Sequence, residues 1–204
     1  MSPVADRLHA LDLRLVDGLD LSDDLRRAHR PGETVRCEDG IERALPRWFY
    51  EVPSWEAAVA TSLTPNFSLY EVVSVDVRED AAARAWPRYV PCAVVALAAA
   101  LEVVREAVGE RVLVAANGGY RSPAHAIDRA FGHVSPHHWG SAADVYRVGD
   151  DYLEDEGSVT KLRGRVLDVL PGVWVRPYGT APGEADDHLH LDLGYLTLDP
   201  PRPR

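Results

Sequence analysis

The sequence predicts an α+β domain in which helices pack mainly on one face of an antiparallel sheet. A long, mostly apolar segment at residues 91–108 has helical spacing, and residues 142–148 and 188–195 have the character of strands. Helical and strand-like segments follow one another in a mixed order, without internal repeats. The last three predicted strands need not be parallel, so antiparallel pairing with helices on one face is the expected arrangement.

The composition is that of a globular protein with one main domain. The chain has 204 residues, of which 46% are hydrophobic, and a formal net charge of −10. This charge and the lack of a run of Lys or Arg argue against nucleic acid and anionic membrane surfaces as partners. The two cysteines, Cys37 and Cys92, form no C-x-x-C pair and are expected to be buried thiols.

The sequence also carries expectations about location. No basic segment followed by an apolar one opens the chain, and no apolar run is long enough to span a bilayer. We therefore expect no membrane insertion and a protein that is cytoplasmic as synthesised. Release by lysis or by a dedicated secretion system would take it out of the cell. The oligomeric state cannot be read from the sequence.

The residues before about 64 are irregular in pattern, with one clear hairpin signal. Two strand-like segments, 34–38 and 41–45, flank Asp39 and Gly40, a pair that is typical of a type I′ turn. An aromatic group follows, which we expect to cover one edge of the core; a carbohydrate or peptide platform is the alternative. Its members are Trp48, Phe49, Tyr50 and Trp55.

Helix signals begin near residue 68. Ser68 and Glu71 have the spacing of a capping box, and residues 79–85 are expected to form a loop or a helical turn. The helix at 91–108 is expected to hold Pro91 in its first turn and to end at Gly109. Because this helix is apolar over most of its faces, we expect it to be buried.

The remaining elements are predicted in the order strand, helix, loop, strand, helix, strand, strand. Ser122 is the expected N-cap of the first of these helices. The loop carries His133, His137 and His138. The segments are 111–116, 123–131, 132–140, 142–148, 159–170, 173–178 and 188–195.

Two segments carry the chemistry of a metal site. Asp144 lies in an apolar strand soon after His137, and a buried carboxylate needs a partner: a metal, an arginine or backbone N–H groups. Alternation in the last strand places His188, His190 and Asp192 on one face and leucines on the other. Two histidine nitrogens and one carboxylate oxygen form a ligand set that Zn²⁺ favours.

Other polar residues lie close to these segments in the sequence. Arg121 ends a predicted strand and could stabilise an oxyanion or hold a substrate carboxylate, with a structural ion pair as the alternative. Ser135 and Trp139 are the other expected substrate-side residues, Ser135 by shaping the loop and Trp139 as a wall of the cleft. Asp192 could orient His190 or His188. His125 is expected at the surface or beside the site.

Taken together, three motifs resemble the M15 family of zinc D,D-peptidases. They are Gly-Tyr-Arg-Ser at 119–122, Ser-x-His-x-x-Gly-x-Ala-x-Asp at 135–144, and His-x-His-x-Asp at 188–192. The resemblance covers roughly residues 65–195. It implies a peptidase domain at 65–196 with a hedgehog/D,D-peptidase-like fold, an N-terminal extension of unknown role at 1–64, and a Pro-rich tail at 197–204.

The resemblance also implies site residues and an activity. Zinc would be held by His137, Asp144 and His190, with Arg121 as the substrate or oxyanion residue. The general base would be Asp187, where many members carry Glu, or His188. The implied reaction is hydrolysis of peptide bonds involving D-amino acids in peptidoglycan-type peptides. Two alternatives stay open: an M15-like zinc enzyme recruited to cytoplasmic biosynthetic chemistry on a small molecule, and a non-catalytic zinc-containing binding module.

Overall fold

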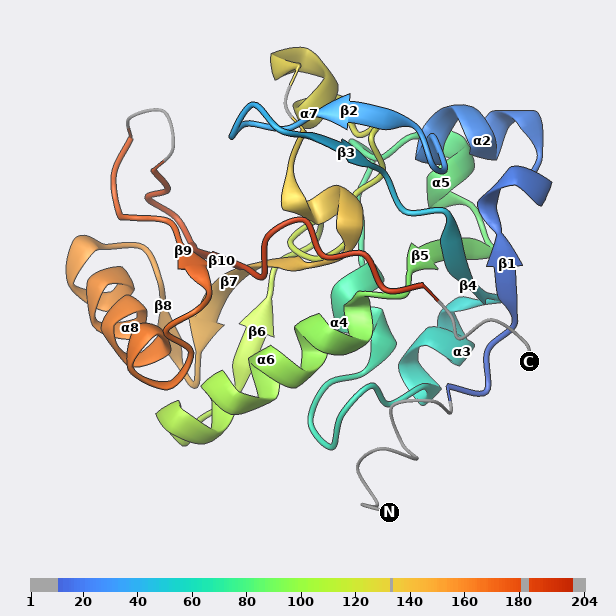
Figure 1. The fold of residues 1–204 in the computed structure, drawn as a ribbon. Coiled ribbons are helices and arrows are strands. Elements are labelled where there is room, and N and C mark those ends of the chain that lie inside the picture. Colours follow the sequence, from blue (N-terminus) through green and yellow to red (C-terminus); the bar gives the residue numbers. More distant parts are fainter. Residues whose placement is uncertain (1–10, 133, 181–183, 200–204) are drawn as a thin grey trace.

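A computed structural model describes residues 11–132, 134–180 and 184–199 of the chain. It has the predicted α+β character, with short antiparallel sheets and helices interleaved along the sequence (Figure 1). Within the described ranges, no helix combines the length and the apolar character that crossing a membrane would require.

The larger sheet carries the candidate site. Its strands run in the order β6 (Val112–Val114), β7 (Ala142–Val148), β10 (Leu189–Asp192) and β9 (Trp174–Val175), and every neighbouring pair is antiparallel. A short strand, β8 (Asp151–Tyr152), extends β7 as a hairpin. The bounds of β7 match the prediction, whereas β10 is shorter than predicted and is followed by Gly194 at a φ of 73°.

The two faces of this sheet differ in chemistry. Ala143, Val145, Leu189 and Leu191 are completely buried in the main core. Helices α6 (Val94–Val108) and α8 (Glu156–Val169) pack against each other and against this sheet (Figure 1). Asp144 and His190 alternate with these apolar side chains and therefore lie on the other face, as alternation predicted for His190 in the last strand.

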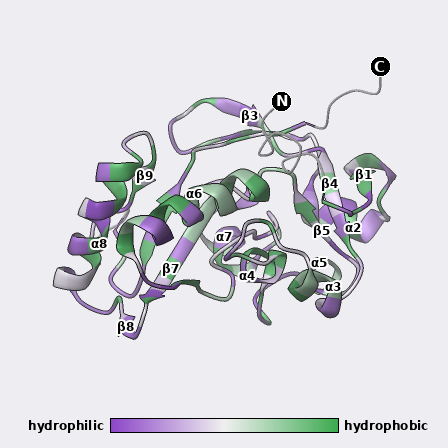
Figure 2. Cartoon of the chain, turned by 90° about the horizontal axis from the view of Figure 1, so that it is seen from below, coloured by the Kyte–Doolittle hydropathy of each residue, from purple (hydrophilic) through white to green (hydrophobic). Residues whose placement is uncertain are grey.

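Helix α6 is buried as expected, but its start differs from the prediction. Pro91 lies at the end of β5 (Arg88–Pro91), opposite Phe49, and the helix begins at Val94. The proline fits there because β5 is an edge strand of its sheet, where the missing N–H breaks no ladder on the open side. Gly109 ends the helix in the left-handed conformation, as predicted. Figure 2 shows the mostly hydrophobic α6 beside the more polar α8.

A smaller sheet lies at the other end of the molecule. Strand β4 (Trp48–Val52) pairs with β1 (Leu15–Asp17) on one side and β5 on the other. Three short helices and a 3₁₀ turn surround it: η1 (Gly18–Asp20), α2 (Asp23–His29), α3 (Trp55–Ala60) and α5 (Ala81–Arg84). Phe49 is buried in the main core, whereas Trp55 is half exposed. The domain boundary at residue 64 stays a prediction, and β4–β5 pairing crosses it.

The hairpin predicted around Asp39-Gly40 is confirmed as β2 (Thr34–Arg36) paired with β3 (Glu42–Ala44). Its turn is not type I′, because a type I′ turn needs a positive φ at both central residues and here only Gly40 has one, at 77°. The Cys37 carbonyl accepts the Gly40 N–H at 2.9 Å, and the Cys37 N–H donates to the Ile41 carbonyl at 2.9 Å. These two bonds close a loop that is longer than a two-residue type I′ turn.

Two short helices precede the site. Helix α4 (Leu69–Val73) has the predicted capping box, with the Ser68 N–H donating to the Glu71 carboxylate at 2.7 Å. Helix α7 (Ala126–Phe131) begins after His125, so Ser122 as its N-cap was wrong. The Ser122 hydroxyl instead donates at 2.6 Å to the buried Glu79, a partner distant in sequence.

Candidate metal centre

Three buried side chains meet on the polar face of the larger sheet. His137 comes from a 3₁₀ turn, η2 (Pro136–Trp139), whereas Asp144 and His190 lie directly opposite each other on β7 and β10. The Asp144 Oδ1 atom is 2.7 Å from His190 Nδ1 and 3.3 Å from His137 Nε2, and the two nitrogens are 3.3 Å apart. This group could hold a metal ion.

The tautomer of His137 is set by the backbone behind it. Its Nδ1 atom lies 2.7 Å from the carbonyl oxygen of Gly119. A carbonyl only accepts, so Nδ1 carries the proton and the lone pair of Nε2 points at Asp144 and His190. Gly119 itself is packed so tightly on Val72 that a Cβ would lie 2.2 Å from the Val72 carbonyl oxygen.

His190 is oriented in the same way by a carboxylate. Its Nε2 atom is 3.1 Å from Asp192 Oδ2, and the other Asp192 oxygen accepts the Gly194 N–H at 2.8 Å. A proton held between Nε2 and Asp192 leaves the lone pair of Nδ1 facing inward. Two imidazole lone pairs and a carboxylate oxygen then face one another in a buried space, and a cation is the species that fits three convergent acceptors.

The electrostatics favour a neutral His137 and an ionised Asp144, whereas His190 holds its proton more tightly than usual. Burial, assisted by the charge of Arg121, lowers the pKa of His137 to about 4, so its ring is neutral near pH 7. Burial opposes ionisation of Asp144, but the three surrounding histidines outweigh it and hold the pKa of this carboxyl well below its usual range. Burial also opposes the charge on His190, yet hydrogen bonds to Asp144 and Asp192 raise its pKa.

Arg121 lies beside the metal group, but its charge is already shared by two carboxylates. Its Nη1 atom is 3.3 Å from Asp144 Oδ2 and its Nε atom is 3.1 Å from Asp128 Oδ2. Nη1 also donates to the carbonyl of Asn117 at 3.1 Å. The ion pair that the sequence left open as an alternative is therefore present, and a contact of Arg121 with substrate stays a prediction.

The two candidate bases lie at the rim of the group. The His188 Nε2 atom is 3.4 Å from Asp144 Oδ1, and its Nδ1 atom is 2.5 Å from Asp187 Oδ1. Burial lowers the pKa of His188, but its contacts with Asp144 and then Asp187 outweigh this and raise it. The Asp187 side chain is 79% exposed, so it contacts the metal group through His188.

Ser135 and Trp139 support the loop that carries His137. The Ser135 hydroxyl accepts the His137 N–H at 3.3 Å, which fits the predicted role in shaping the loop. Trp139 is completely buried, and its indole N–H donates to the Ala44 carbonyl at 3.2 Å. Trp139 thus packs inside the protein against the β2–β3 hairpin, which does not fit the wall of an open cleft.

Two other histidines of this region are buried. His125 is completely buried, so of its two expected positions the surface is wrong; its Nδ1 atom is 3.7 Å from Oδ2 of Asp128, the partner of Arg121. His138 is buried, with Nδ1 at 3.2 Å from the Arg121 carbonyl. His133 lies outside the described residues. Asp128 was not predicted as a site residue, because its link to the site runs through the side chain of Arg121.

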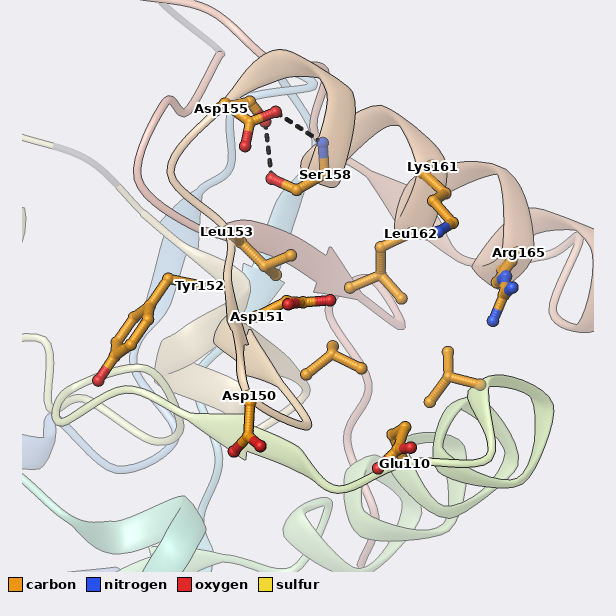
Figure 3. A pocket seen from close by; sticks show the side chains of 12 residues that line it. Glu110, Asp150, Asp151, Tyr152, Leu153, Asp155, Ser158, Lys161, Leu162 and Arg165 are labelled. Carbon is orange, nitrogen blue, oxygen red and sulfur yellow. Dashed lines mark hydrogen bonds between the residues drawn. The ribbon is translucent and has the colours of Figure 1, made fainter.

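Two hollows help to place the site. One runs along the end of β6 and α4 and reaches His188; it is lined by Tyr70, Glu71, Ser74, Val114, Ala115, Ala116, Tyr146, Asp187 and His188. The other lies between the end of α6, the β7–β8 hairpin and α8, and contains no member of the metal group (Figure 3). There Asp155 caps α8 through the Ser158 N–H at 2.9 Å, a structural role.

No protein-family model, no curated protein and no solved structure matches the chain.

Proposed function

We propose that the chain is a zinc-dependent metallopeptidase that hydrolyses peptide bonds involving D-amino acids in peptidoglycan-type peptides, on a hedgehog/D,D-peptidase-like fold. One observation carries the proposal: His137, Asp144 and His190 present three acceptor atoms within 3.3 Å of one another, and the outer partners of both histidines direct their lone pairs inward. Two histidines and one carboxylate leave a coordination position for water or substrate.

A bound zinc ion would lower the pKa of a water and polarise a carbonyl oxygen. The chain's own residues would position the reactants and move the proton. Asp187 would keep the proton on Nδ1 of His188, which leaves Nε2, on the side of the metal group, to accept a proton from water and later to protonate the leaving amine. The open hollow that ends at His188 would hold the substrate on the acyl side.

The Arg121 guanidinium would contribute by holding Asp144. Its contacts to Asp144 and Asp128 fix one oxygen of the ligand carboxylate, so that the other points at the two histidines. This arrangement supports a rigid site.

A non-catalytic zinc module is the second candidate. The observation that favours it is the Asp187 side chain, which is 79% exposed and bonds only to His188 among the residues described. Glutamate is longer by one methylene than the aspartate present here. A site that had lost its base could keep zinc for structure alone.

Metal analysis followed by mass spectrometry of digested muropeptides tests the proposal. We expect about one zinc per chain and the release of D-Ala, a D-Ala-containing dipeptide or a cleaved peptide stem. Stoichiometric zinc without any such release would rule out the peptidase and leave the binding module and the zinc enzyme acting on a small molecule.

A further inference from the structure

Strand β9 lies beside β10 and contributes its own side chains to the polar face of the sheet. Val175 is paired with Leu191 and is buried in the core with it. Trp174 is opposite Asp192, and the Arg176 N–H donates to the His190 carbonyl at 3.0 Å. Because residues opposite each other across a sheet share a face, Trp174 and Arg176 lie on the face of the metal group.

Trp174 contacts the metal group directly. Its ring centroid is 5.6 Å from that of His190, in an edge-on arrangement, and the residue is 49% exposed. The guanidinium carbon of Arg176 is 5.7 Å from the centre of the Trp174 ring. The Trp174 ring therefore lies between the buried ring of His190 and the guanidinium of Arg176.

The charge of Arg176 is available in a way that the charge of Arg121 is not. Its Nε–H is buried and has no hydrogen-bond partner, which is costly for a donor unless a ligand supplies the acceptor. No described carboxylate forms an ion pair with Arg176, whereas Arg121 already holds both Asp144 and Asp128.

The opposite side of the metal group has the reverse character. None of the described residues that line the hollow ending at His188 is Lys or Arg, and two of them, Glu71 and Asp187, are acidic. An anionic group would be disfavoured there and favoured beside β9. The two sides of the metal group therefore differ in charge: the hollow that ends at His188 is acidic, and the β9 side carries the positive charge of Arg176.

We propose that Arg176, on the Trp174 surface, binds a carboxylate of the substrate next to the scissile amide, with the acyl part of the substrate in the hollow that ends at His188. This inference rests on the proposed function and gives the substrate its direction. Arginine suits the task because its planar fork matches a carboxylate with two parallel hydrogen bonds.

Binding of small product-like probes tests the inference apart from hydrolysis. The zinc-loaded protein is titrated with N-acetyl-D-alanine, N-acetyl-D-alaninamide and N-acetyl-D-isoglutamine, with the Trp174 indole N–H resonance as reporter. The first probe offers an α-carboxylate, the second none, and the third a side-chain carboxylate. We expect at least one carboxylate probe to bind about tenfold more tightly than the amide.

The variants are Arg176→Gln, which removes the charge, and Arg176→Lys, which keeps it without the fork. Arg165→Gln, an exposed arginine of α8, is the matched control, and zinc content verifies that each variant is folded. We expect Arg176→Gln to abolish the preference, Arg176→Lys to keep part of it and Arg165→Gln to keep all of it. An equal response to the three probes, or a preference that survives in Arg176→Gln, overturns the inference. Hydrolysis of muropeptides by a protein that does not prefer the carboxylate probes to the amide would overturn this inference and leave the proposed function standing.

Discussion

The metal group and its rim are built in opposite ways, although they are adjacent. His137 and His190 are about 99% buried, and each has its outer nitrogen fixed by a partner, a backbone carbonyl for one and Asp192 for the other. At the rim, His188 is only partly buried and its outer partner, Asp187, is largely exposed. The orientation of the two candidate ligands is thus fixed by buried partners. The outer nitrogen of His188, the residue that would move a proton, is oriented by its contact with the exposed Asp187.

The largest effect should come from removing a buried ligand. His137→Ala takes away one of three donors and leaves Asp144 and His190, so we expect metal affinity to fall by more than about a hundredfold, because changes to outer partners alone cost 10–100-fold. All hydrolysis should be lost with the metal. Metal analysis after dialysis measures this, and full retention of zinc would show that the site is misassigned.

A substitution at the rim should separate chemistry from metal binding. We expect His188→Gln to keep zinc and to lose about 10²–10⁴-fold in kcat, the usual contribution of a general base. Asp187→Asn should cost less, because it changes only the orientation of the ring. If Asp187→Asn is as damaging as His188→Gln while zinc content is unchanged, Asp187 is itself the base.

A substitution of Asp192, the carboxylate that contacts the outer nitrogen of His190, tests whether this contact orients the ligand. Asp192→Asn weakens the acceptor that orients His190, and we expect a loss of about 10–100-fold in zinc affinity. Asp186→Asn, an exposed neighbour, is the control and should have no effect. Equal zinc affinities for both variants would show that the Asp192 contact does not orient the ligand.

Acid should release the metal gradually. The pKa of His190 is raised above its ordinary 6.5, so below that pKa a zinc ion must displace a proton from Nδ1. Zinc affinity should therefore be constant above the raised pKa and fall by about tenfold per pH unit below it. A competition titration with a chelator at several pH values measures the slope, and a flat profile between pH 5 and 7 would contradict the raised pKa.

The sequence predicted the strands of the site well because their signals are local. The strand-like character of residues 142–148 matched the bounds of β7, and alternation placed His190 and Asp192 on the face opposite Leu189 and Leu191. The same reasoning failed where the partner is distant. Ser122 resembles an N-cap, yet its hydroxyl binds Glu79, and nothing near it in the sequence indicates this.

The side-chain contacts of Arg121 and Trp139 could likewise not be predicted from the sequence. Arg121 was placed at the site, but its two carboxylate contacts depend on how α7 folds back towards β7. Trp139 was expected to be open to a cleft, and its burial follows from the β2–β3 hairpin, whose position no motif near residue 139 reveals. Periodicity predicts which face a residue occupies; it does not predict what is packed on that face.

That hairpin has a consequence for how the protein is made. Its residues, 34–44, leave the ribosome long before Trp139, the side chain that they cover, and His190 emerges later still. A hairpin alone is only marginally stable in water, and contacts between distant segments form slowly. The candidate metal group can therefore assemble only after residue 190 has left the ribosome, because a shorter nascent chain lacks one of the three ligands.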